Sequence, residues 1–189
     1  MMLFYYCFLF TTITFGQTTP KLNINMIQHI SFEEILPIWR DYLWPNRVSA
    51  IENTSAMTFL GGYDLKNMQH EPTFFAYTMN NKIVGVNSGH LFYDNSYRSR
   101  GLWVFPEYRG NRIGIQLLLA AIEQGTNENV DYIWSYPKFS SWNTYRAAGF
   151  TLASKWHQSE LDLNAYCTTT VPGSILPNAS NPHLRSAQE

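Results

Sequence analysis

The chain of 189 residues is poor in charge and in cysteine. Charged residues make up only 14%, against about 25% in an average protein, and 13 basic residues nearly balance 14 acidic ones. Without a basic excess we expect no nucleic-acid partner, because phosphate contacts dominate that affinity. The two cysteines, Cys7 and Cys167, can build neither a disulfide framework nor a zinc cluster, and no metal site is expected.

Long apolar runs are also missing. Residues 2–10 form the most apolar stretch near the N-terminus, but a membrane span takes about 20 such residues, so no stable span is expected. This stretch fits a secretory signal peptide, although no Lys or Arg precedes Lys21. It equally fits an extension upstream of a true start at Met26.

What the sequence does contain is enough apolar material for one folded core. Apolar residues account for 45% of the chain and aromatic ones for 16%, which excludes a disordered protein. The C-terminal end is rich in Thr, Pro, Asn and Ser and has no hydrophobic period. We therefore predict an N-terminal extension at 1–25, a folded domain at 26–167 and a low-complexity tail at 168–189.

The apolar pattern of this domain predicts an α/β fold. Ser31 and Glu34 suit a capping box at the start of a helical stripe, which Pro37 should kink or delay. Asn80 and Asn81 suit a hairpin turn, and Gly149 suits the end of a short helix. The expected order is β-α-α-β-β-β-α-β-α-β-β, with strands at 26–30, 73–79, 82–93, 101–105, 130–136, 150–156 and 160–166, and helices at 32–43, 48–60, 114–124 and 139–148.

One segment carries a chemical signal. A strand ends at Pro106, and the polar loop that follows opens directly into an apolar helix. The first N–H groups of a helix lack internal partners and the helix dipole adds positive potential, so such a loop suits a pyrophosphate. Gly110 and Gly114 would permit close backbone approach, and Arg109 and Arg112 would add charge. The same glycines would also serve an ordinary β-α turn.

These residues resemble a known family. Val104-x-Pro106-Glu-Tyr-Arg-Gly-x-x-Ile-Gly114 is similar to motif A of the GNAT superfamily of acyl-CoA-dependent N-acetyltransferases. Residues 145–150, Tyr-Arg-Ala-Ala-Gly-Phe, are similar to its Tyr-x-x-x-Gly-Phe segment, and the element order over 26–166 agrees with its fold. Two departures are Arg112, where the family has a glycine, and Lys138, where many relatives have Asn.

The resemblance implies a fold, a co-substrate and residue roles. The fold would be a GNAT-like mixed central sheet with flanking helices, in which strands 101–105 and 130–136 splay apart to hold the thioester of acetyl-CoA. Tyr145 would protonate the leaving CoA thiolate. The cofactor-binding residues would be Leu102, Trp103 and Val104 along the pantetheine arm and Arg109, Gly110, Asn111, Arg112, Ile113 and Gly114 around the pyrophosphate.

The implied function is transfer of an acetyl group from acetyl-CoA to a primary amine of a small molecule or peptide, by direct attack in a ternary complex in the cytoplasm. His90 is a candidate base, with a water relay as the alternative. We expect two sets of aromatic residues to have further roles. An acceptor pocket could be lined by Trp103, Trp134, Trp142 and Trp156, and a homodimer surface could form at Phe92, Tyr93 and Tyr97.

Two other functions stay open. The chain could be a non-catalytic CoA-binding protein of this fold, because Arg112 and Lys138 replace the usual residues. It could also be a secreted interaction protein, if residues 2–10 belong to a working signal peptide.

Overall fold

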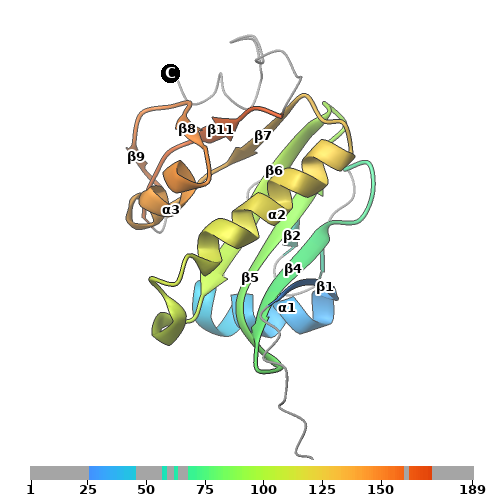
Figure 1. The fold of residues 1–189 in the computed structure, drawn as a ribbon. Helices are drawn as coiled ribbons and strands as arrows, with labels where there is room; N and C mark the ends of the chain where they lie inside the picture. Colours follow the sequence, from blue (N-terminus) through green and yellow to red (C-terminus); the bar gives the residue numbers. More distant parts are fainter. Residues whose placement is uncertain (1–25, 46–56, 59–61, 64–67, 160–161, 172–189) are drawn as a thin grey trace, which may run out of the picture.

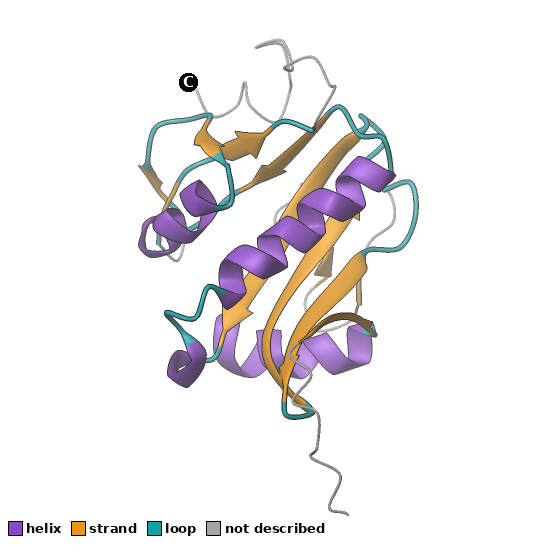
Figure 2. Cartoon of the chain, viewed as in Figure 1, coloured by secondary structure: helices purple, strands orange, loops and turns teal. Residues whose placement is uncertain are grey.

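The computed structural model describes residues 26–45, 57–58, 62–63, 68–159 and 162–171 (Figure 1). In this part of the chain, seven strands form one mixed sheet in the order β1-β4-β5-β6-β7-β11-β8. Neighbouring strands are antiparallel except β6 and β7, which run parallel. Helices cover both faces of the sheet (Figure 2). This arrangement confirms the predicted α/β fold with a mixed central sheet.

The sheet strands are β1 Met26–Ile30, β4 Thr73–Met79, β5 Lys82–Leu91, β6 Ser96–Val104, β7 Tyr132–Ser135, β8 Thr151–Leu152 and β11 Cys167–Thr169. Two small antiparallel pairs lie outside it, β2 Met57–Thr58 with β3 Gly62–Tyr63, and β9 His157–Gln158 with β10 Leu163–Asn164. The α-helices are α1 Phe32–Ile38, α2 Ile113–Asn127 and α3 Trp142–Ala147. Shorter helical turns are η1 Trp39–Leu43, η3 Pro106–Tyr108 and η4 Phe139–Ser141.

Two apolar layers hold the helices to the sheet. On β4, Phe75 and Tyr77 pack into the cluster under α2, while Phe74 and Ala76 pack against α1 on the other face. Side chains alternate across a strand, so one strand feeds both layers and is apolar throughout. Helix α3 packs beside α2, on the same side of the sheet (Figure 1).

Within the described residues no helix is both long and apolar enough to cross a membrane.

The local signals around α1 are confirmed. The Ser31 hydroxyl accepts from the Glu34 N–H at 3.2 Å, and the Ser31 N–H donates to the Glu34 carboxylate at 2.8 Å, which completes the capping box. The helix runs through Pro37 and then widens into the π-helical turn η1, where the Trp44 N–H donates to the Trp39 carbonyl at 2.8 Å. The disturbance expected at Pro37 is therefore a change of helix type.

Two turn predictions also hold. Asn80 and Asn81 have φ of 51° and 61° between β4 and β5, and Gly149 has φ of 96° after α3. The 26–30 and 73–79 strands match their predicted bounds, whereas β6 starts at Ser96, five residues earlier than the predicted strand at 101. Most of the predicted helix at 48–60 lies outside the described residues, and Met57–Thr58 is strand β2.

The predicted final hairpin of strands 150–156 and 160–166 is wrong. Strand β8 pairs with β11, and β9 with β10 forms a hairpin of its own outside the main sheet. Strand β11 takes the place beside β7 because Cys167 lies opposite Ser135 on the buried face, and the threonines that follow favour an extended chain. The ordered chain therefore continues past the boundary predicted at 167, through Thr169 to the buried Val171.

Candidate active site

The parallel strands β6 and β7 separate partway along their length. Their pairing joins Ser96 to Tyr132 and ends with Arg98 opposite Trp134, whereas β6 continues to Val104. The last link between them is a hydrogen bond of 2.8 Å from the Ser135 hydroxyl to the Ser99 carbonyl. Beyond it, residues 101–104 of β6 pair with no residue of β7 in the described part of the chain (Figure 1). This is the splay that the family resemblance implied for strands 101–105 and 130–136.

A β-bulge in β6 lies next to this opening. Ser88 of β5 pairs with Arg100, but two residues earlier Val86 pairs with Trp103, so β6 carries an extra residue. Gly101 lies in that bulge with φ of 73°. Its carbonyl accepts a 2.7 Å hydrogen bond from the Trp39 indole N–H, and a Cβ there would lie 2.5 Å from the indole ring. This role of Gly101 was not predicted, although a glycine inside a strand was the available signal.

The segment after β6 forms a tight loop into α2. A 3-10 turn at Pro106–Tyr108 is followed by Gly110 with φ of 82°, and α2 starts at Ile113. The first backbone bond of the helix runs from the Gln116 N–H to the Arg112 carbonyl at 3.1 Å. The side chain of the N-cap residue Arg112 makes no capping hydrogen bond to the amides of the first turn. These N–H groups and the helix dipole make the start of α2 suited to an anion.

Two side chains of the loop hold it against β6 and η3. The Arg109 Nε–H donates to the Val104 carbonyl at 2.9 Å, and the guanidinium lies 4.8 Å from the centre of the Trp103 ring. The Asn111 amide donates to the Tyr108 carbonyl at 3.1 Å. Arg109 and Asn111 thus shape the loop through their side chains, which leaves the main-chain amides as its anion-binding groups.

Gly114 lies where three elements meet. A Cβ on this residue would lie 3.0 Å from the Thr144 methyl on α3, and 3.8 Å from the side chains of Leu102 and Val104 on β6. The start of α2 can approach both elements only because residue 114 is small. The predicted residues Leu102, Val104 and Gly114 are therefore brought together at the mouth of the opening.

Arg112 has φ of 59° and ψ of 10°, a left-handed conformation that side chains with a Cβ rarely adopt. Replacing it with glycine should relieve this strain and stabilise the fold by about 1 kcal/mol. We expect the melting temperature without ligand to rise by roughly 2–4 °C in Arg112→Gly. Arg112→Lys keeps the Cβ and the charge and should melt like the unmodified protein. A melting temperature of Arg112→Gly at or below that of Arg112→Lys would contradict the strain.

Tyr145 lies at the closed end of the opening. Its side chain is buried, with the ring edge-on to Phe150 at 5.4 Å between centres. The hydroxyl oxygen is 3.4 Å from the Ser135 Oγ, the group that links β7 to β6. Burial raises the pKa of the Tyr145 phenol well above its usual value, so the phenol is protonated at neutral pH and has a proton to donate.

His90, the candidate base, lies buried on β5, where its Nε2 is 2.8 Å from the Ser88 hydroxyl. Burial, together with the charges of Arg100 and Arg98, holds the pKa of His90 well below its usual range. Its imidazole is therefore neutral at physiological pH and enclosed in the sheet. We assign it a structural role, as expected of most histidines inside a strand.

Other predicted residues are dispersed. Lys138 forms an ion pair with Asp162 at 3.5 Å. The four tryptophans do not line one pocket, because Trp103 packs with the α1 cluster, Trp134 with Phe92 and Tyr132, and Trp142 with Trp156. The prediction that Phe92, Tyr93 and Tyr97 form one exposed homodimer surface is also wrong. Phe92 and Tyr97 are buried, and only Tyr93 is exposed, at 69%.

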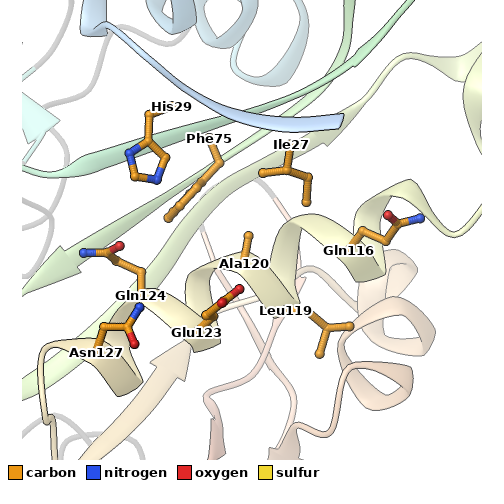
Figure 3. Close-up of a pocket in the computed structure, with 9 residues that line it drawn as sticks. All are labelled: Ile27, His29, Phe75, Gln116, Leu119, Ala120, Glu123, Gln124 and Asn127. Carbon is orange, nitrogen blue, oxygen red and sulfur yellow. The ribbon is translucent and has the colours of Figure 1, made fainter. Parts of the chain in front are cut away.

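A separate groove of about 560 Å³ lies between β1 and α2 (Figure 3). It lies on the side of α2 that faces the β1–β4 edge, away from α3 and the opening between β6 and β7 (Figure 1). No predicted site residue lines it. The lining residues are Ile27, His29, Phe75, Gln116, Leu119, Ala120, Glu123, Gln124 and Asn127.

Across the described part of the chain, no three or more His, Cys, Asp or Glu side chains form a group that could bind a metal.

Comparison with known proteins points to one family. The sequence model of the acetyltransferase (GNAT) family matches residues 36–150, more than half of the chain. A search of curated proteins returned no significant match.

Solved structures share the fold at low sequence identity. Escherichia coli ElaA is 12% identical, with a TM-score of 0.60 over 77% of this chain and 99% of that one. The ribosomal-protein-S18-alanine N-acetyltransferase of Escherichia coli is 16% identical, with a TM-score of 0.55 over 82% and 97%. A GNAT-family acetyltransferase of Staphylococcus aureus Mu50 is 19% identical, with a TM-score of 0.55 over 77% and 99%. At these identities the likeness extends to the fold alone.

Proposed function

Because the chain belongs to the GNAT family of acetyltransferases, we propose that it transfers the acetyl group of acetyl-CoA to a primary amine of a small molecule or peptide. One observation carries the proposal. Within the described residues, β6 continues beyond its last pairing with β7, from the region of Ser135 and the Tyr145 hydroxyl at the closed end of the opening to the start of α2 at its mouth. A long ligand could lie along this part of β6, with its anionic end at the start of α2 and its reactive end beside Tyr145.

Different residues along β6 and the following loop would bind different parts of acetyl-CoA. The amides of Gly110 and Asn111 and of the first turn of α2 would bind the pyrophosphate. The main chain of residues 102–104 would pair with the pantetheine arm in place of a strand. The thioester would then lie where β6 and β7 part, beside Ser99, Ser135 and the Tyr145 hydroxyl.

Catalysis in this arrangement is mainly positioning. The amine attacks the thioester carbonyl directly while both substrates are bound, a C–N bond forms and the C–S bond breaks. An N–H near Val104 would polarise the carbonyl, and the protonated Tyr145 phenol would donate its proton to the departing thiolate. Since acetyl-CoA is an intracellular metabolite, the same proposal assigns the reaction to the cytoplasm.

Thermal unfolding of the full chain with and without acetyl-CoA tests the cofactor site. A ligand at 100 times its Kd adds about 2.7 kcal/mol, which should raise the melting temperature by roughly 5–10 °C. Asn111→Asp introduces a negative charge into the proposed pyrophosphate loop and removes the Asn111 bond to Tyr108, so the shift should shrink. Asn127→Asp makes the same change at the exposed last residue of α2 and should keep the full shift.

Three outcomes separate the candidate functions. A shift that responds to Asn111→Asp, followed by acetyl transfer to some amine of a panel, supports the enzyme. The same shift without transfer to any amine favours the non-catalytic CoA-binding protein. No shift at millimolar acetyl-CoA contradicts both and favours the secreted interaction protein.

A further inference from the structure

A hydrogen-bonded tyrosine and histidine lie beside the opening, on the face opposite Tyr145. Along β7 the side chains alternate, so Ser135 points toward Tyr145 while Trp134 and the following Tyr136 point to the other face. The Tyr136 hydroxyl oxygen is 2.5 Å from the His157 Nε2. Tyr136 directly follows the residue that makes the last link between β6 and β7.

Neighbouring groups hold this pair in place. The rings of Tyr136 and His157 both pack on Tyr166, at 4.6 Å and 6.4 Å between centres. The Asn164 amide donates to the Tyr136 carbonyl at 3.2 Å. The His157 Nδ1 lies 3.3 Å from the Lys155 carbonyl, which assigns the ring proton to Nδ1. Nε2 is then the acceptor, and the Tyr136 hydroxyl donates to it.

The position of His157 differs from that of the other described histidines. His90 is buried among arginines, His29 lies on β1 beside the groove, and His70 pairs with Glu128 at the far end of α2. His157 is exposed, so a proton taken up there can leave to solvent. The charged side chains on the elements around His157 are Lys155, two residues earlier in the chain, and the ion pair of Lys138 with Asp162. The backbone of Lys138 forms an isolated β-bridge with Asn164 of β10.

We propose that Tyr136 and His157 form the proton relay that deprotonates the acceptor ammonium, a role that rests on the proposed acetyl transfer. The ammonium gives one proton to the Tyr136 oxygen as the Tyr136 proton passes to the His157 Nε2. The resulting imidazolium releases its proton to solvent. The free amine attacks the thioester carbon, and the thiolate that leaves takes the Tyr145 proton. The second amine proton restores Tyr145, so one proton is released per turnover.

The relay places the two proton transfers on opposite faces of one opening. Tyr145 acts on the departing sulfur from the α3 side, and Tyr136 with His157 acts on the amine from the other side. Acceptor and CoA would therefore enter from different faces and meet where β6 and β7 part. This assignment replaces His90, and it also replaces a relay made only of water.

The test uses Tyr136→Phe, His157→Gln and the double variant of the full chain, with acetyl-CoA and the fastest amine of a panel of alkyl, arylalkyl and peptide amines. Removing a general base lowers kcat by about 10²-fold or more. We expect each single variant to lose that much, the double variant to lose no more than a single one, and the pH–rate profile of His157→Gln to differ from that of the unmodified protein. The acetyl-CoA melting shift should persist in all three.

His29→Gln is the matched control, because it makes the same change at an exposed histidine beside the groove. It should keep the wild-type rate and pH profile. Wild-type rates in Tyr136→Phe or His157→Gln would overturn the relay while leaving acetyl transfer intact. Losses that multiply in the double variant would also overturn it, since two groups of one relay act as a unit. An unmodified protein that transfers acetyl to no amine would overturn the proposed function and the relay together.

Discussion

Tyr145→Phe is expected to lower kcat by about 10²–10⁴-fold, the range for loss of a general acid. The phenol is protonated and lies 3.4 Å from the Ser135 Oγ, the group that links β7 to β6, and the substitution removes only the oxygen. The KM for acetyl-CoA should change little, because the loop before α2 and the edge of β6 are untouched. Steady-state kinetics of thiol release against acetyl-CoA concentration measure both constants.

The structural cost of this change should be small. The Tyr145 hydroxyl has one recorded hydrogen-bond partner, Ser135 at 3.4 Å, and Ser135 keeps its bond to Ser99. Loss of one such bond changes the free energy of unfolding by about 1 kcal/mol. Tyr132→Phe is a matched control, since it removes the hydroxyl of another buried tyrosine, at the start of β7 and 3.5 Å from Asp94. Equal rates in both variants would reject Tyr145 as the acid.

Local sequence signals predicted those features of the site that depend only on residues adjacent in the chain. Pro106 ends a strand, the polar loop opens into an apolar helix, and Gly149 ends α3, so local signals predicted the loop before α2 and the end of α3. The role proposed for Tyr145 came from the family resemblance of residues 145–150. The apolar run within residues 73–79 predicted a strand with its observed bounds. Local periodicity also located α2, which extends only three residues beyond its predicted end.

The parts that the sequence could not supply depend on pairing between distant segments. β11 lies between β7 and β8, although it follows both in the chain, and short two-residue strands carry no period to detect. Tyr136 and His157 meet because the β9–β10 hairpin folds back beside the end of β7. The lowered pKa of His90 likewise depends on its burial in the sheet and on the charges of Arg100 and Arg98 from the next strand. None of these contacts is encoded in the spacing of neighbouring residues.

Gly101→Ala is expected to be strongly destabilising, by about 3 kcal/mol. A left-handed backbone costs an alanine about 1–2 kcal/mol, and overpacking against a rigid neighbour costs roughly the same again. That neighbour is the Trp39 indole, which is 1% exposed, donates to the Gly101 carbonyl and lies 2.5 Å from the new Cβ. The melting temperature should fall by roughly 6–12 °C.

Gly110→Ala separates the two costs. Gly110 has a similar φ of 82°, but no atom lies within 4 Å of a Cβ built on it, so only the backbone cost applies. We expect a loss of about 1–2 kcal/mol, and a fall of roughly 2–8 °C. Because the bulge at Gly101 sets the direction of β6 beyond its pairing with β7, Gly101→Ala should also reduce the melting shift produced by acetyl-CoA. Equal melting temperatures for Gly101→Ala and Gly110→Ala would mean that Trp39 yields to the added methyl group, and that the bulge does not depend on their close contact.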